Sequence, residues 1–188
     1  MKILLLGKDG QVGHELKRTL LPLGDVHAFG RQGANLENLE ALRELLAQQA
    51  PDIIVNAAAY TAVDKAETNQ DVARTVNADA VAEIARYAKE NDALFVHYST
   101  DYVFDGRKEA PYDIDDQTNP QSVYGSTKLA GEAAITASGC KALILRTSWV
   151  FSAHGGNFIK TILRLAKERD ALNICLLYTS DAADDSLR

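Results

Sequence analysis

Residues 2–13 read KILLLGKDGQVG, an apolar run that leads directly into a glycine-containing turn. The run Lys2–Leu6 is typical of a strand that is buried on both faces of a parallel sheet. Apolar residues at helical spacing, such as Val12 and Leu16, then continue to Pro22. The stretch predicts a strand, a glycine turn and a helix at the start of an α/β fold.

The turn contains Gly7, Gly10 and Gly13 in the spacing Gly-x-x-Gly-x-x-Gly. In nucleotide-binding turns one glycine permits the tight bend, one lets the backbone approach a pyrophosphate, and one lets the helix pack closely. Exposed amides and the helix dipole then hold the phosphates. The spacing differs from the usual Gly-x-Gly-x-x-Gly, but its position between strand and helix favours dinucleotide binding over a purely structural turn.

The rest of the chain alternates strands and helices, with no repeat of solenoid length. This alternation predicts an open, doubly wound parallel sheet with right-handed crossovers and helices on both faces. Further strands are expected at 25–29, 52–56, 94–98 and 142–146, and further helices at 36–46, 72–91, 122–137 and 158–167. Asn35 and Asn157 are expected to cap two of these helices.

The ends of the strands carry polar or small residues that suit a cofactor site. Arg31, after the second strand, could accept a 2′-phosphate and favours NADPH, since neither Gly30 nor Arg31 is an acid that would favour NADH; a solvated loop arginine is nearly as good an alternative. Ala58 and Ala59 follow the third strand, where small side chains let a cofactor lie against the backbone; simple helix packing would also explain them. Thr100, with Ser99 as second choice, could hydrogen-bond a carbonyl group, but both residue types are also common turn formers.

Tyr124 and Lys128 lie one turn apart if residues 122–137 are helical. A free phenol has a pKa near 10, and an adjacent ammonium makes the phenol easier to deprotonate, so the pair suits a general acid. The pair alone would equally fit an ordinary helix with a packed tyrosine and a solvated lysine. Its expected placement at the same sheet edge as the glycine turn and Thr100 favours the catalytic interpretation.

The composition limits the classes of partner and the cellular compartment that we expect. The net charge of -6 and pI near 5.2 argue against nucleic-acid or anionic-membrane partners. Cys140 and Cys175 match no metal or redox spacing, and the amino terminus is too short for a signal peptide or membrane span, so a cytoplasmic protein is expected. The polar stretch 105–120 is expected to be a long loop near the active site.

The chain resembles the extended short-chain dehydrogenases that act on nucleotide sugars. The resemblance rests on the glycine turn, on Asn56-Ala57-Ala58-Ala59, on Ser99-Thr100-Asp101-Tyr102 and on Tyr124-x-x-x-Lys128. Residues 59–67, 102–106 and 146–150 are similar to the dTDP-4-dehydrorhamnose reductase family in particular. The resemblance covers residues 1–173 and implies an NAD(P)-binding Rossmann-like domain there.

The resemblance also implies a family length that this chain does not reach. Family members continue for roughly a hundred more residues into a smaller substrate domain, by analogy, which is then largely missing here. Residues 174–188 match nothing in the family, and we expect this tail to have no fold of its own. The chain is therefore expected to be an amino-terminal fragment.

The implied reaction is the last step of dTDP-L-rhamnose synthesis, in which NADPH or NADH reduces the C4 ketone of dTDP-4-dehydro-L-rhamnose. By this resemblance Tyr124 donates the proton, Lys128 holds the nicotinamide ribose, and Thr100 polarises the ketone. Further implied contacts are Gly10, Gln11 and Val12 to the pyrophosphate, Ala58, Ala59 and Tyr98 along the cofactor, and Asp101 and Trp149 toward the sugar nucleotide. Glu15 corresponds to a Mg²⁺ contact of a possible homodimer in the family, although a glutamate on a first helix is more often simply solvated.

Two other functions remain open at this stage. A nucleotide-sugar epimerase or 4,6-dehydratase would share the fold, the cofactor and the Tyr124–Lys128 pair. The dehydratases place an acid where this chain has Tyr102, which favours plain reduction. A non-catalytic regulatory subunit, like the regulatory beta subunit of methionine adenosyltransferase, could keep the same motifs.

Overall fold

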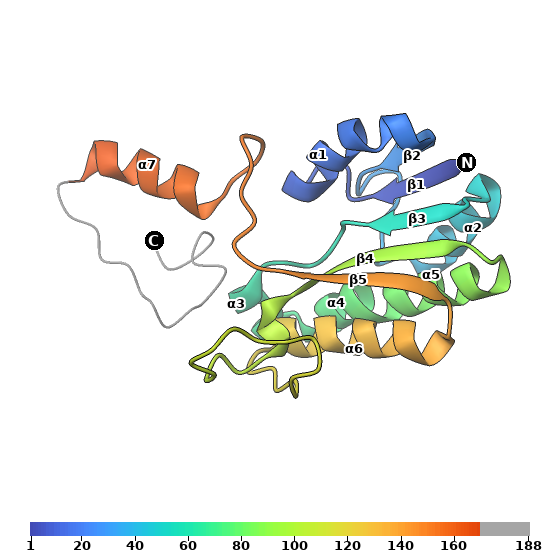
Figure 1. Ribbon diagram of the computed structural model, residues 1–188. Coiled ribbons are helices and arrows are strands. Elements are labelled where there is room, and N and C mark those ends of the chain that lie inside the picture. Colours follow the sequence, from blue (N-terminus) through green and yellow to red (C-terminus); the bar gives the residue numbers. More distant parts are fainter. Residues whose placement is uncertain (170–188) are drawn as a thin grey trace.

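The computed structural model describes residues 1–169, and their centre is a parallel β-sheet (Figure 1). Its strand order is β2-β1-β3-β4-β5, and every neighbouring pair is parallel. The strands are β1 (Lys2–Leu6), β2 (Asp25–Phe29), β3 (Ile53–Asn56), β4 (Leu94–Thr100) and β5 (Lys141–Thr147). The predicted α/β parallel sheet is confirmed, whereas the expected tail 174–188 lies outside the described residues.

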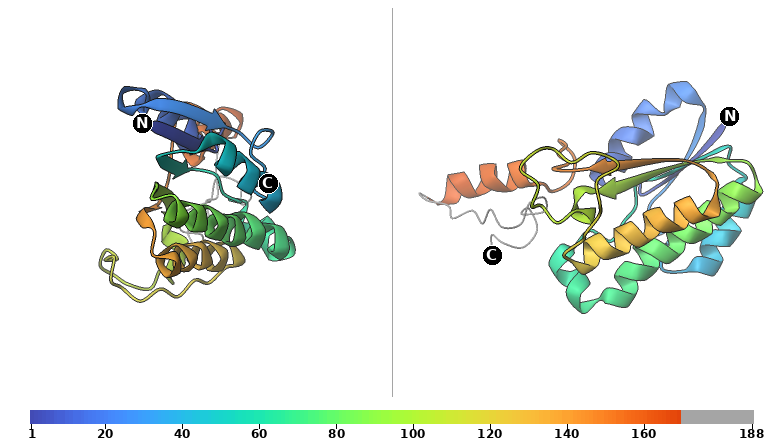
Figure 2. Two further views of the ribbon diagram at one scale, coloured as in Figure 1. Left: turned by 90° about the vertical axis from the view of Figure 1, so that its right-hand side faces the viewer. Right: turned by 60° about the horizontal axis from the view of Figure 1, so that its bottom comes forward.

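Helices cover both faces of the sheet (Figure 2). One face carries α1, and the other carries α2, α5 and α6, while α7 lies beyond the carboxyl ends of the strands (Figure 1). The helices are α1 (Gln11–Thr19), α2 (Leu39–Gln49), α3 (Val63–Thr68), α4 (Gln70–Arg74), α5 (Ala80–Glu90), α6 (Val123–Ser138) and α7 (Phe158–Glu168). None of these described helices is long and apolar enough to cross a membrane.

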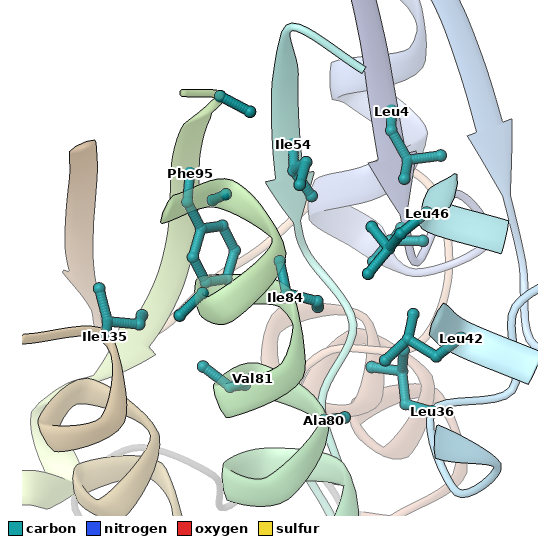
Figure 3. Packing of buried hydrophobic residues seen from close by; sticks show 14 residues of the cluster. Leu4, Leu36, Leu42, Leu46, Ile54, Ala80, Val81, Ile84, Phe95 and Ile135 are labelled. Atoms are coloured by element: carbon teal, nitrogen blue, oxygen red, sulfur yellow. The ribbon is translucent and has the colours of Figure 1, made fainter. Parts of the chain in front are cut away.

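The larger hydrophobic core lies between the sheet and the layer formed by α2, α5 and α6 (Figure 3). Leu4 and Leu6 of β1 point into it, while the intervening Leu5 packs toward α1, because successive strand side chains face opposite sides. These three leucines have no exposed surface. Burial on both faces explains why β1 reads as a continuous apolar run.

The predicted long helix 72–91 is interrupted. A π-helical segment, Thr75–Asp79, separates α4 from α5 and turns Asn77 inward. The Asn77 side chain accepts from the backbone N–H of Tyr60 at 2.8 Å and donates to the Tyr60 carbonyl at 3.1 Å and to the Thr127 hydroxyl at 3.1 Å. These tertiary hydrogen bonds compensate for the irregular turn, which is a common arrangement near functional sites.

The prediction that Asn35 caps the second helix is wrong. The helix begins later, and Asn38 is its cap, with the side-chain oxygen accepting from the N–H of Ala41 at 3.1 Å. Asn35 instead accepts from the N–H of Glu37 at 3.2 Å and shapes the preceding turn. Both asparagines satisfy backbone donors, so the sequence pattern alone could not separate them.

The strand order creates a crevice between two neighbouring strands. The chain leaves β1 toward β2 on one side and later returns to place β3 on the other side of β1. Ligands of open α/β sheets bind outside the carboxyl ends of the strands at such a reversal. The ends of β1 and β3 are followed by Gly7 and by Ala57, so the predicted glycine turn and alanine run meet at this point.

Candidate active site

The glycine turn is held in a shape that other residues could not adopt. Gly7 has φ +86°, and a Cβ there would lie 2.6 Å from the Ala58 nitrogen. A Cβ on Gly13 would lie 2.0 Å from the Gly7 carbonyl oxygen, so Gly13 lets α1 pack onto the turn. The α1 helix starts after Gly10 with no side-chain cap, which leaves its first-turn amides suited to an anion.

A pocket of about 840 Å³ opens beyond the carboxyl ends of the strands. It brings together nearly all the site residues predicted from the sequence. These are Gly7, Gly10, Gln11, Val12, Arg31, Ala58, Ala59, Tyr98, Thr100, Asp101, Tyr124, Lys128 and Trp149. Gly13 and Glu15 do not line it. Gly13 has the packing role described above.

Glu15 is engaged within the chain. Its carboxylate accepts from the Ser152 hydroxyl at 3.0 Å and pairs with Arg18 at 3.5 Å. The hydrogen bond from Ser152 is the main cause that lowers the pKa of Glu15. Among residues 1–169 there is no group of three or more His, Cys, Asp and Glu side chains that could hold a metal ion. The expected Mg²⁺ contact at Glu15 therefore has no support here.

Two hydrogen bonds fix the start of α6. The Ser122 hydroxyl accepts from the N–H of Gly125 at 3.1 Å, and the Glu67 carboxylate accepts from the N–H of Val123 at 2.9 Å. Tyr124 then lies in the first turn and Lys128 in the next, as the spacing predicts. Both side chains are buried and line the pocket.

Lys128 is one of the most deeply buried side chains, with 1% exposure. Its Nζ donates to the Tyr98 carbonyl at 2.6 Å and lies 3.2 Å from Nε2 of His97. Burial lowers the pKa of Lys128 to about 8, against the opposing charge of Glu132. Burying an ammonium group costs free energy. A buried lysine with a lowered pKa beside a pocket is therefore typical of a functional site.

The two hydroxyl groups at the end of β4 have different partners. The Ser99 hydroxyl donates to Glu132 at 2.5 Å, and Glu132 is also paired with Arg146 at 2.6 Å. The Thr100 hydroxyl accepts from the N–H of Tyr102 and donates to the Asp101 carboxylate, both at 3.2 Å. A substrate oxygen could therefore replace Asp101 as the acceptor of the Thr100 hydroxyl, whereas the Ser99 hydroxyl is bound to the Glu132–Arg146 ion pair.

Arg31 forms an ion pair with Glu37, and both residues line the pocket. Glu37 is six residues from Arg31 in the sequence, so the residues directly at the end of β2 do not reveal this acid. The turn that follows, with hydrogen bonds from the N–H groups of Gly33 and Ala34 to the Gly30 carbonyl, brings the later carboxylate back to Arg31. The Arg31 guanidinium and the Glu37 carboxylate therefore both lie where we expect the adenosine ribose of a cofactor.

Asn157 has a second role that its sequence position did not reveal. Its side-chain oxygen caps α7 by accepting from the N–H of Lys160 at 3.0 Å, as predicted. Its side-chain nitrogen also donates to the Gln11 side chain at 3.1 Å and to the Ser152 carbonyl at 2.7 Å. The loop before α7 is thereby joined to the glycine turn.

The stretch 105–120 differs from the expectation, because none of its residues lines the pocket. It is held by its own contacts instead. The Tyr112 hydroxyl donates to Asp105 at 2.8 Å, and the Tyr112 ring stacks on Phe104 with centroids 4.2 Å apart. Its length therefore reflects a self-packed surface loop.

The fold, the glycine turn and the placement of Tyr124 and Lys128 define a Rossmann-like domain of the extended short-chain dehydrogenase type. The chain belongs to the family described as the RmlD substrate binding domain, whose model matches residues 1–176.

Among its relatives, the dTDP-4-dehydrorhamnose reductase of Burkholderia thailandensis is 51% identical over 174 residues, covering 93% of this chain and 58% of the relative. The enzyme of the same name from Escherichia coli K12 is 51% identical over 178 residues, covering 93% and 60%. The crystal structure of a dTDP-4-dehydrorhamnose reductase from Bacillus anthracis in complex with NADP has a TM-score of 0.85 at 36% identity, covering 89% of this chain and 60% of that one. The chain thus spans 58–60% of the length of these relatives.

Proposed function

We propose that this chain forms the cofactor-binding and catalytic part of a reductase that converts dTDP-4-dehydro-L-rhamnose into dTDP-L-rhamnose, the last step of dTDP-rhamnose biosynthesis. The observation that carries the proposal is the meeting of Thr100, Tyr124 and Lys128 at the pocket that the glycine turn opens. The identity of 51% to reductases of that name supports the choice of substrate.

The residues present fit a nicotinamide dinucleotide. Side chains at Gly7 and Gly13 would fill the cradle of the turn, and the uncapped first turn of α1 offers amides to a pyrophosphate. Gln11, Val12, Ala58, Ala59 and Tyr98 would lie along the cofactor, and Arg31 and Glu37 would meet its adenosine ribose. When bound, NADPH or NADH supplies the hydride for the ketone carbon.

The protein's own contribution is the proton and the stabilisation of charge. Tyr124 donates its phenolic proton to the ketone oxygen as negative charge develops there. The Lys128 ammonium, held near the first turn of α6, stabilises the resulting phenolate and binds the nicotinamide ribose. The Thr100 hydroxyl donates a second hydrogen bond to the ketone oxygen after turning away from Asp101.

The open side of the pocket would receive the sugar nucleotide. Asp101 and Trp149 both line it, and the Trp149 ring, 46% exposed, meets Phe158 edge-on at 5.1 Å. Exposed aromatic surface of this kind provides contact area for a sugar or base. The acid Asp101 can accept hydrogen bonds from sugar hydroxyls. We place the reaction in the cytoplasm, and a homodimer stays a prediction.

The test is nicotinamide oxidation with dTDP-4-dehydro-L-rhamnose. It compares this chain with a fusion that adds the carboxyl-terminal remainder of the Burkholderia thailandensis relative. We expect both to bind NADPH or NADH and the fusion to turn over. Cofactor binding without turnover of this substrate by either protein would contradict the proposal. An epimerase or dehydratase would then act on another nucleotide sugar, whereas a regulatory module would act on none.

A further inference from the structure

A chain of buried polar groups runs from the cofactor pocket to Lys128. It begins at the backbone N–H of Ala58, which donates to the Asn56 side-chain oxygen at 3.1 Å. The Asn56 side-chain nitrogen lies 3.3 Å from Nδ1 of His97, and Nε2 of the same ring lies 3.2 Å from Nζ of Lys128. Asn56 and His97 have no exposed surface, so water does not compete for these contacts.

The direction of these hydrogen bonds fixes the tautomer of His97. Because the Asn56 oxygen receives the Ala58 N–H, the Asn56 amide nitrogen faces His97 and can only donate to Nδ1. Burial, followed by the charge of Lys128, keeps the pKa of His97 well below its usual value, so the ring is neutral. A neutral ring with a bare Nδ1 carries its hydrogen on Nε2, which points at Lys128.

This arrangement fits the neutral amine of Lys128. The amine accepts from Nε2–H of His97 through its lone pair and donates to the Tyr98 carbonyl at 2.6 Å. An ammonium group has donors only, so it needs a bare Nε2. The hydrogen of His97 must then move to Nδ1, and Asn56 must turn its oxygen toward His97 and away from Ala58.

We propose that His97 is a positioning residue, and that its tautomer, set through Asn56, couples the proton on Lys128 to the Ala58 amide at the cofactor pocket. His97 touches neither the pocket surface nor the predicted reacting atoms, and it acts through Lys128. The catalytic meaning of this coupling rests on the proposed reductase function. The tautomer and the titration of Lys128 are properties of this chain whether or not it is a reductase.

Other charged and titratable groups surround Lys128 and could influence its proton. Glu132 lies one turn further along α6 and opposes the effect of burial. Its charge is already engaged by an ion pair with Arg146, whereas the His97 contact can change with the tautomer of the ring. His97 and Tyr98 of β4 contact Lys128 directly, Tyr124 of α6 and Asp101 of the following turn line the same pocket, and Arg146 of β5 acts through its ion pair with Glu132 of α6.

The direct test uses this chain without cofactor. Nitrogen-15 NMR of the imidazole rings reports which nitrogen carries the hydrogen, and His97 is the buried one of the four histidines. Carbon-13 NMR of the lysine side chains follows the titration of Lys128. We expect His97 to carry its hydrogen on Nε2 at high pH and on Nδ1 once Lys128 is protonated. A tautomer that stays the same through the Lys128 titration would overturn the proposal.

Two variants sharpen the result. His97→Leu removes a hydrogen-bond partner from both protonation states of Lys128. The ammonium loses the stronger, charge-assisted hydrogen bond and its surroundings become more apolar, so the Lys128 titration should move downward. An upward or absent shift would show that His97 does not accept from the ammonium and therefore does not change tautomer with Lys128. Asn56→Asp offers acceptors to both neighbours and should hold the hydrogen on Nδ1 at every pH. His27→Leu, at a partly exposed histidine of β2, is the matched control and should leave Lys128 unchanged.

The activity measurement uses the fusion protein. In His97→Leu the alkaline limb of kcat should move downward together with the Lys128 titration, which a merely structural role would not produce. An unmoved limb beside a moved Lys128 titration would show that the coupling has no part in the reaction. Failure of the wild-type fusion to turn over would count against the reductase function alone, because the NMR result decides the tautomer separately.

Discussion

Gly125 lies against the backbone of Tyr102, so closely that a Cβ on Gly125 would stand 2.3 Å from the Tyr102 carbonyl oxygen. The first turn of α6 therefore rests directly on the short helical turn Asp101–Val103 that follows β4. The Tyr124 and Tyr102 rings meet edge-on with centroids 5.5 Å apart. This close approach is what brings the predicted proton donor to the end of β4.

Gly125→Ala should therefore disturb the packing of α6 against the Tyr102 backbone. The added methyl group meets backbone, which cannot move aside as a side-chain end could, so we expect a loss of about 1–3 kcal/mol in the free energy of unfolding. Urea denaturation measures this loss. Ser126→Ala, at the neighbouring exposed position of the same helix, is the control and should change stability by less than about 0.5 kcal/mol. Equal stability of the two variants would show that the contact is easily relieved.

Tyr124→Phe should abolish reduction while leaving cofactor affinity nearly unchanged. The phenyl ring keeps the packing against Tyr102 but has no proton to donate, and loss of a general acid typically lowers kcat by about 10²–10⁴-fold. The measurement is single-turnover reduction by the fusion protein, with cofactor binding measured separately. Tyr87→Phe on α5 serves as a control, since Tyr87 does not line the pocket. An unchanged rate in Tyr124→Phe would remove its assignment as proton donor.

The ion pair of Arg31 and Glu37 should govern the choice between NADPH and NADH. If Arg31 meets the 2′-phosphate, Arg31→Ala should weaken NADPH by about tenfold, as for a lost hydrogen bond between charged groups, and should leave NADH nearly unchanged. Glu37→Gln releases Arg31 and should strengthen NADPH binding. Calorimetric titration of both cofactors measures these changes, with the exposed Arg18→Ala as control. An equal loss for both cofactors in Arg31→Ala would exclude a role in discrimination.

Glu83 should make stability depend on pH on the acid side. Its carboxylate accepts from Arg43 at 2.7 Å and from Arg86 at 3.0 Å, and these bonds, led by the one from Arg43, lower the pKa of Glu83 to about 2. A carboxyl group whose pKa is lowered on folding stabilises the protein above its unfolded pKa, near 4.5, and loses this contribution as pH falls toward 2. Partly exposed partners reduce the expected contribution to about 1–2 kcal/mol.

The measurement for Glu83 is urea denaturation of the wild type and Glu83→Gln between pH 7 and pH 2. The difference in the free energy of unfolding between the two proteins should be constant above pH 5 and should shrink below it. The other carboxyl groups titrate alike in both proteins, so their contributions cancel in this difference. A difference that does not depend on pH would show that the Arg43 contact contributes nothing in solution.

The sequence predicted the layout of the domain because its signals are local. Apolar runs that end in glycine or small residues mark buried parallel strands, and the carboxyl ends of such strands share one sheet edge. That rule alone placed Gly7, Ala58 and Thr100 at one pocket, where the structure has them. The spacing of Tyr124 and Lys128 needed only the helix, which Ser122 begins as expected.

The features that the sequence did not predict depend on contacts between distant segments. The π-helical segment is stabilised by hydrogen bonds of Asn77 with Tyr60 and Thr127. These residues are 17 and 50 positions from Asn77, too far for a local sequence pattern to show. Glu37 reaches Arg31 only through a compact turn. His97 stands among apolar residues of β4, where a histidine gives no periodic signal, and its importance follows from its two ring contacts.

The contacts of Asn77 also join the pocket wall and α6 into one unit. Asn77 holds both backbone atoms of Tyr60, at the wall of the pocket, and also bonds Thr127 on α6, while a Cβ on Gly131 would lie 2.3 Å from the Asn77 carbonyl oxygen. The native contacts that the pocket wall and α6 make with Asn77 therefore depend on each other. Native-state hydrogen exchange should therefore show the Tyr60 amide opening together with the amides of α6, in one cooperative unit.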